Sequence, residues 1–149
     1  MQKTTLYAYI KLTGKDDVDD CPLEVVTERL GVQPTETWRV GDRINNIVSR
    51  AYSFTCWKYE SERLETLDAD DVLLPILNVF ESKTDIINQL KEELNLDVQI
   101  ELVITMIDGY TPGLVILPEF SRFASSINAF IDIDIDIDMY VESYNEPEE

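Results

Sequence analysis

Alternating apolar and polar residues predict three strands in this chain. The alternation runs from Thr4 to Leu12, from Asp97 to Ile107 and from Ile131 to Val141. Side chains two residues apart lie on the same face of a strand, so each stretch predicts a strand with one buried face. In the last stretch, isoleucine occupies the odd positions from 131 to 137 and aspartate the even positions from 132 to 138. We expect these isoleucines in the core and these aspartates in solvent.

Three shorter stretches are expected to add strands. Thr35 to Val40 follows Pro34, which disfavours a helical conformation at the residue before it. Ala51 to Tyr59 is rich in aromatic and other strand-forming residues, although its pattern leaves open which face is buried. Leu114 to Leu117 follows a turn, and we expect it to pair back on the preceding strand.

Apolar residues at spacings of three and four predict four helices. They cover Pro22 to Leu30, a stretch from Asp68 or Asp70 toward Phe80, a stretch from Ser82 or Thr84 to Leu94, and one opened by Pro118. Gly31 and Asn95 are suited to end the first and third, because both residue types tolerate the left-handed conformation at a helix end. Pro75 lies inside the second helix, where its missing backbone N–H is expected to bend or break it.

The order of these elements predicts a single α+β domain over residues 1–149. Strands and helices alternate as β-α-β-β-α-α-β-β-α-β, which favours a mixed, mainly antiparallel sheet with helices packed mostly on one face, a two-layer sandwich. A chain of 149 residues with 44% hydrophobic residues is long enough for one such core. The acidic tail from about residue 142 is expected to fray.

One stretch carries a family resemblance. The run LGVQPTETWRVGD, from Leu30 to Asp42, leaves a helix at Gly31 and ends in a Gly-Asp turn. With Trp57 downstream and an Ile-Asp strand ending at Tyr140, the chain resembles an uncharacterised bacterial family called domain of unknown function 4279. The resemblance covers roughly Thr5 to Val141. It implies a compact α+β fold in bacteria and supplies no catalytic residues.

The net charge of −18 is the strongest constraint on partners. Only 12 basic residues oppose 30 acidic ones, so nucleic acid and anionic membrane surfaces are repelled and a basic protein is attracted. The alternative is that the charge only keeps the protein soluble. The chain has no apolar run long enough to span a membrane and no signal peptide at its N-terminus, so we expect a cytoplasmic protein.

The complete absence of histidine excludes several kinds of chemistry. Ser-His and Cys-His nucleophilic catalysis and histidine-ligated metal sites all require it. Cys56 alternates with aromatic residues and is expected to be a buried, inert thiol, while Cys21 precedes a helix without a neighbouring base. The aspartates from 132 to 138 could hold a cation, but a solvent-exposed row that discourages aggregation is the favoured interpretation. We expect no catalytic residue, metal or cofactor.

The candidate binding residues cluster in the middle of the chain: Trp38, Arg39, Asp42, Arg43 and Trp57. Between residues 37 and 59, four basic residues accompany the single acid Asp42, and aromatic residues with arginine are typical of binding hot spots. Core placement of both tryptophans is the alternative.

From the acidic charge and this cluster we expect a non-enzymatic module that binds a basic protein, such as an immunity-type inhibitor of a basic toxin. The competing hypothesis is a small-molecule-binding protein or carboxylate-based hydrolase with its site near the Trp38–Asp42 loop. The sequence leaves the oligomeric state open.

Overall fold

The fold is a single sheet with one layer of helices against it. The structure, a computed structural model, describes residues 3–15, 21–44 and 50–138. The strands are β1 (Thr5–Gly14), β2 (Glu36–Trp38), β3 (Cys56–Glu60), β4 (Leu64–Glu65), β5 (Leu96–Ile107) and β6 (Phe130–Asp138). Their order is β2-β3-β1-β5-β6, with β4 paired to the beginning of β1. All pairs are antiparallel except β5 with β6, so the predicted mixed, mainly antiparallel α+β sheet is confirmed.

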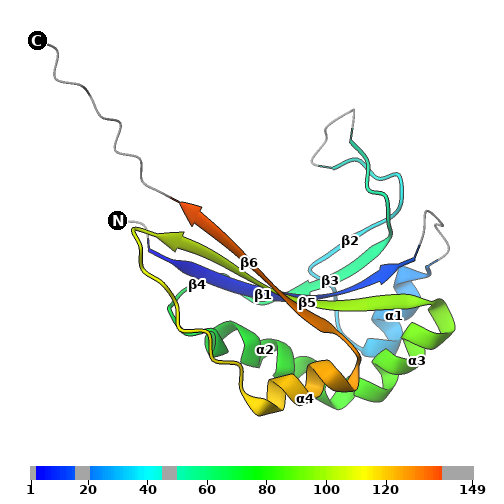
Figure 1. Ribbon diagram of the computed structural model, residues 1–149. Coiled ribbons are helices and arrows are strands. Elements are labelled where there is room, and N and C mark those ends of the chain that lie inside the picture. The colour runs from blue at the N-terminus through cyan, green and yellow to red at the C-terminus, as the bar shows by residue number, and fades with distance from the viewer. Residues whose placement is uncertain (1–2, 16–20, 45–49, 139–149) are drawn as a thin grey trace, which may run out of the picture.

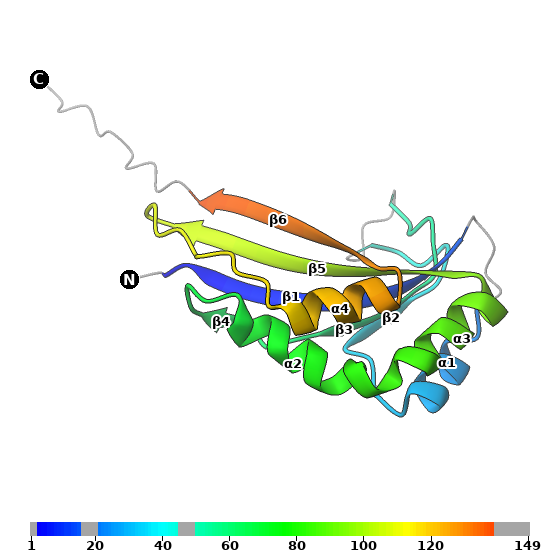
Figure 2. The ribbon, with the colours of Figure 1, turned by 60° about the horizontal axis from the view of Figure 1, so that its bottom comes forward.

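The helices lie together on one side of the sheet, as Figures 1 and 2 show. They are α1 (Leu23–Leu30), α2 (Asp70–Phe80), α3 (Thr84–Leu94) and α4 (Pro118–Ser126), with a short 3₁₀ turn, Glu81–Lys83, between α2 and α3. The apolar face of β1 and the apolar face of β5 are buried against these helices, as the alternation of apolar and polar residues predicted. Within the described part of the chain, the opposite face of the sheet carries no helix. We call it the uncovered face.

The two predicted helix ends are confirmed by backbone geometry. Gly31 has a φ of 68° and its N–H donates to the carbonyl of Thr27, while Asn95 ends α3 with a φ of 55°. The expected break at Pro75 does not occur, since α2 continues from Asp70 to Phe80 around it. Pro75 and Asp71, whose carbonyl loses its N–H partner, are both exposed, and buried residues on both sides of the proline hold the helix in place.

Two predicted strand segments are wrong. Residues 51–55 form no continuous strand, because the chain there pairs locally with residues 41–44, through Arg43 bridged to Ala51 and Tyr52 bonded to Asp42. Residues 39–44 and 50–55 together form an arm that rises on the uncovered side (Figure 1). Residues 114–117 do not pair back on β5 either, because β6 already occupies that edge of β5.

The isoleucines of β6 are less buried than expected. Ile131 and Ile133 are half-buried against the core, but Ile135 and Ile137 are 49% and 63% exposed. The reason is that β6 is an edge strand, and α4 lies along only its first part (Figure 1). The predicted continuation to Val141 and the tail from about residue 142 lie outside the described residues.

Candidate functional site

The two tryptophans lie on opposite faces of the sheet. In the pairing of β2 with β3, Trp57 is opposite Thr37 and Trp38 is opposite Cys56, so the two side chains fall on alternate positions of the pleat. Trp57 is fully buried among the helices, where its Nε1 donates to Thr27 Oγ1 at 3.0 Å and its ring meets Phe80 edge-to-face. Of the candidate binding residues, Trp57 is therefore part of the core.

Trp38 belongs to an aromatic group on the uncovered side. Its ring stacks on Tyr52 of the arm with centroids 4.3 Å apart and meets the edge of Phe54 at 5.7 Å. The side chain is half-buried by these contacts. The stack packs the arm against the sheet.

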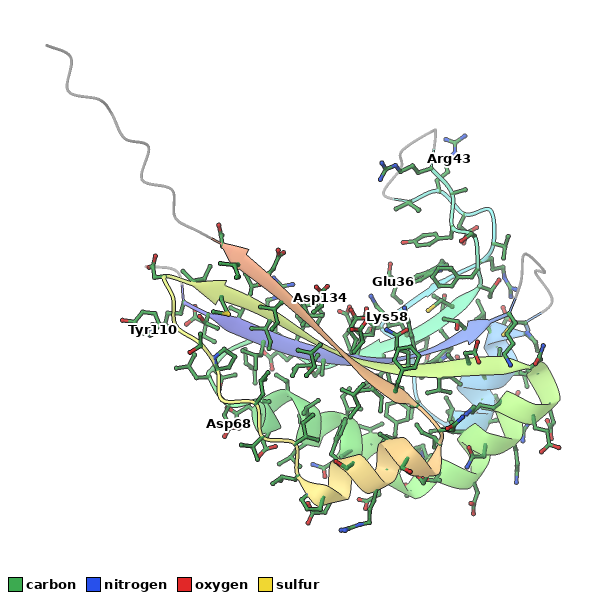
Figure 3. All side chains as sticks on the ribbon, viewed as in Figure 1. Glu36, Arg43, Lys58, Asp68, Tyr110 and Asp134 are labelled. Carbon is green, nitrogen blue, oxygen red and sulfur yellow. The ribbon has the colours of Figure 1, made fainter. Side chains whose placement is uncertain are left out.

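Arg39 and Asp42 form a turn that is fastened to α1. The backbone N–H of Arg39 donates to Asp42 Oδ2 at 2.8 Å, and the N–H of Asp42 donates to the carbonyl of Arg39 at 3.0 Å. The guanidinium of Arg39 bonds the Cys21 carbonyl at 3.0 Å and Glu24 at 3.4 Å. Trp38, Arg39 and Asp42 line a hollow of about 420 Å³ beside α1. Arg43 does not line it, because it lies exposed at the outer end of the arm (Figure 3).

The uncovered face carries a row of four aspartates along β6. In the register with β5, Asp132 lies beside Glu101, Asp134 beside Val103 and Asp136 beside Thr105. Asp138 completes the aspartate row, and all four side chains are exposed. Figure 3 shows Asp134 on the side of the sheet that faces away from the helices. The four carboxylates are therefore accessible to solvent and lie on the same face of the sheet.

A hydrogen-bonded group joins this row to the middle of the sheet. The hydroxyl of Tyr9 donates to the carboxylate of Glu101, and Gln99 Nε2 donates to Glu101 at 3.2 Å and to Asp132 at 3.5 Å. Burial, followed by the hydrogen bond and charge of Glu101, raises the pKa of Tyr9 far above its usual value. Tyr9 is consequently a permanent donor that holds Glu101 in place.

Lys58 is the central cation of the uncovered face. Its ammonium lies 4.6 Å from the centroid of Tyr9 and 5.7 Å from that of Trp38, and it pairs with Glu60 at 2.9 Å and Glu36 at 3.2 Å. Burial lowers the pKa of Lys58, but the bonds and charges of Glu60 and Glu36 together outweigh burial and leave the pKa raised. The ammonium of Lys58 is thus protonated, and the carboxylates of Glu36 and Glu60 balance its charge.

The thiol of Cys56 and the clustering of acidic side chains bear on the chemistry that the described residues could support. Burial raises the pKa of Cys56 to about 12, so its thiol is protonated at neutral pH, which agrees with the predicted inert cysteine. Within residues 3–15, 21–44 and 50–138, no group of three or more Cys, Asp or Glu is placed to hold a metal ion. The face offers charge, aromatic surface and hydrogen-bond acceptors, which are the components of a binding surface.

The alternation along β1 and β3 is a sequence signal for part of this face. Tyr7, Tyr9 and Lys11 are the residues of β1 that alternate with its buried positions, and Lys58 has the same role on β3. Their side chains became a recognisable group only once the register placed them beside Glu101 and the aspartate row.

Comparison with known proteins identifies a family but no function. The family model described as a domain of unknown function, DUF4279, matches residues 4–138. Neither a curated protein nor a solved structure matches the chain. None of the helices in the described part of the chain is long and apolar enough to cross a membrane.

Proposed function

The chain belongs to the DUF4279 family, a domain of unknown function, and we propose that this member is a non-catalytic module that binds a basic protein. The observation that carries the proposal is the position of the aspartate row on the face of the sheet that none of the described helices covers. Inhibition of a basic toxin by an immunity-type protein is the biological role that we propose for it.

The electrostatics of the aspartate row favour a cationic partner. None of its four carboxylates forms an ion pair with another described residue, and the whole chain carries a net charge of −18. Neighbouring carboxylates on one strand repel each other, at a separation of about 6.6 Å from the strand geometry. A basic surface relieves this repulsion, and the field of the molecule speeds its approach.

The same face supplies apolar contact area beside the charges. Phe130 begins β6 on this side and is 61% exposed, and the half-buried rings of Tyr7 and Tyr9 lie on β1. Arg63 lies over the ring of Tyr7, 4.7 Å from its centroid. Aromatic side chains next to charges are typical of protein-binding hot spots. Glu101 and Lys58 are held in place by neighbouring side chains, which suits a preformed binding surface.

Charge reversal on the two faces of the molecule tests this proposal. The double variant Asp134→Lys/Asp136→Lys alters the uncovered face, and Glu28→Lys/Glu92→Lys alters exposed positions on α1 and α3. Both variants change the net charge by the same amount. We expect the first to weaken binding of a poly-lysine peptide by roughly tenfold, equivalent to about 1.4 kcal/mol, and the second to weaken it far less. Equal weakening by both would mean that only net charge matters and would refute the proposed face.

The hollow beside α1 supports a second candidate function, the binding of a small molecule. Its specific support is that Trp38, Arg39 and Asp42, three of the candidate residues, line the same space of about 420 Å³. A library of small metabolites can be screened by NMR, with the indole N–H signals of the two tryptophans as reporters. A ligand in the hollow should shift the signal of Trp38, which lines the space, and that of Trp57, because the Trp57 indole N–H donates to Thr27 on the wall of the hollow. If no compound does so, this candidate is rejected.

A further inference from the structure

The outer edge of β6 is an unpaired strand edge. Among residues 3–15, 21–44 and 50–138, β6 is the last strand of the sheet and pairs with β5 only. Alternate residues along its nine-residue length therefore direct N–H and C=O groups to an edge that has no neighbouring strand. The opposite edge of the sheet, β2, is only three residues long. Of the two edges, β6 offers much the longer template for another strand.

The two faces of β6 differ in chemistry along this edge. On the uncovered face stand the four exposed carboxylates of the aspartate row. On the helix face, Ile135 and Ile137 are exposed beyond the part of the strand that α4 covers. The second half of β6 thus combines accessible backbone, exposed acid on one side and exposed aliphatic surface on the other.

We propose that β6 receives an extended segment of the partner in which lysine or arginine alternates with valine or isoleucine. An added strand continues the pleat of the sheet, so its side chains fall alternately on the two faces. The basic residues then lie beside the aspartates, and the apolar residues lie beside Ile135 and Ile137. This inference rests on the proposed function and specifies how the basic partner binds.

Charge argues against a second copy of the chain as the occupant. Pairing of β6 with another β6 would bring two aspartate rows side by side on the same face, and like charges on neighbouring strands are destabilising. The same row that discourages self-association favours a strand of opposite charge. The alternation of Ile and Asp in β6 therefore disfavours pairing with a second copy of the chain and favours pairing with a basic strand.

Synthetic peptides of nine residues, the length of β6, test the inference. One peptide alternates lysine and valine, and a second has the same composition with the lysines and valines in separate blocks. Strand addition requires alternation, so the alternating peptide should bind roughly tenfold more tightly, a difference of about 1.4 kcal/mol. Equal affinity would contradict strand addition while leaving the proposed basic partner intact. If neither peptide binds at low salt, the proposed function itself fails.

Backbone methylation gives a second and more specific readout. In a strand, the N–H groups of alternate residues point to the same edge, so methylating every lysine N–H blocks one edge and methylating every valine N–H blocks the other. One methylated form of the alternating peptide should lose binding and the other should keep it. Loss in neither form would overturn strand addition.

Substitution of the exposed isoleucines tests the apolar side of the edge. Ile135→Thr/Ile137→Thr keeps β-branched residues on β6 and should weaken the alternating peptide several-fold while leaving poly-lysine affinity unchanged. Val25→Thr, on α1 and 39% exposed, is the matched control and should change neither. Circular dichroism checks that each variant is folded. An unchanged affinity of the Ile135→Thr/Ile137→Thr variant for the alternating peptide would contradict the assigned apolar contact.

Discussion

The exposure of individual side chains separates the residues that hold this fold together from those available for binding. Ile104 on β5 and Ile135 on β6 are direct neighbours in the register and point to the same side of the sheet. Ile104 is fully buried, whereas Ile135 is 49% exposed. Identical residues on adjacent strands therefore contribute differently, because one strand is central and the other forms the edge.

Truncation of these two isoleucines should have unequal effects on stability. We expect Ile104→Ala to lower the free energy of unfolding by about 2–5 kcal/mol, the usual range for a buried aliphatic side chain. Ile135→Ala should cost about 1 kcal/mol or less, because much of the side chain already contacts water. Urea denaturation of both variants measures the difference. A large loss for Ile135→Ala would mean that other groups cover β6 in solution.

The side chains with raised pKa values predict a loss of stability in alkali. Tyr9 and Cys56 retain their protons in the folded state well above the pH at which they ionise in the unfolded chain, near their usual values of 10.0 and 9.0. Above these values the folded state binds more protons, so the free energy of unfolding falls as pH rises. The raised pKa of Lys58 acts in the same direction, because its favourable charge is lost as pH rises through its folded pKa.

Tyr9→Phe isolates the contribution of the phenol. At neutral pH the variant should lose about 1–3 kcal/mol, since the carboxylate of Glu101 loses a donor. Its stability should then decline less steeply than that of the wild type above about pH 10, because one of the groups with a raised pKa is gone. Thermal melting at a series of pH values provides the comparison. Parallel curves for both proteins would show that Tyr9 does not contribute to the alkaline loss.

At the scale of secondary structure, sequence patterns predicted the central elements and failed at the edges. The alternation of β1 identified its buried face correctly, because a central strand is covered by helices along its length. The same alternation in β6 indicated two different faces but could not tell how far α4 would cover one of them. The placement of Trp38 and Trp57 on opposite faces depends on the register between β2 and β3, which distant contacts determine.

Pro75 allows a prediction at this scale. It lies exposed within α2, where it removes one backbone hydrogen bond although the helix continues. Pro75→Ala restores that bond and raises helix propensity, and the greater freedom of the unfolded chain offsets part of the gain. We expect a net stabilisation of about 1–2 kcal/mol by urea denaturation. Destabilisation would show that the proline shapes the helix for packing of its buried side, including Leu73 and Ile76.

At the scale of the whole molecule, the two faces of the sheet have different surroundings. Helices bury the apolar side and form the core, while the other side presents the aspartate row, the aromatic group around Trp38 and the neutralised Lys58. Composition predicted an acidic protein with a basic partner but could not say where the acids lie. The exposure of the aspartate row follows from the alternation of β6 together with the position of the described helices on the other side of the sheet.

The most direct test of this account is to map a bound basic peptide onto the protein by NMR. An alternating lysine–valine peptide should cause its largest amide shifts in β6 and in the neighbouring residues of β5, such as Glu101 and Val103, at low salt. The helix face around Glu28 and Glu92 should stay unchanged, and the shifts should diminish as salt screens the charges. Shifts confined to the helices, or to the hollow lined by Arg39 and Asp42, would contradict the assignment of the uncovered face as the binding surface.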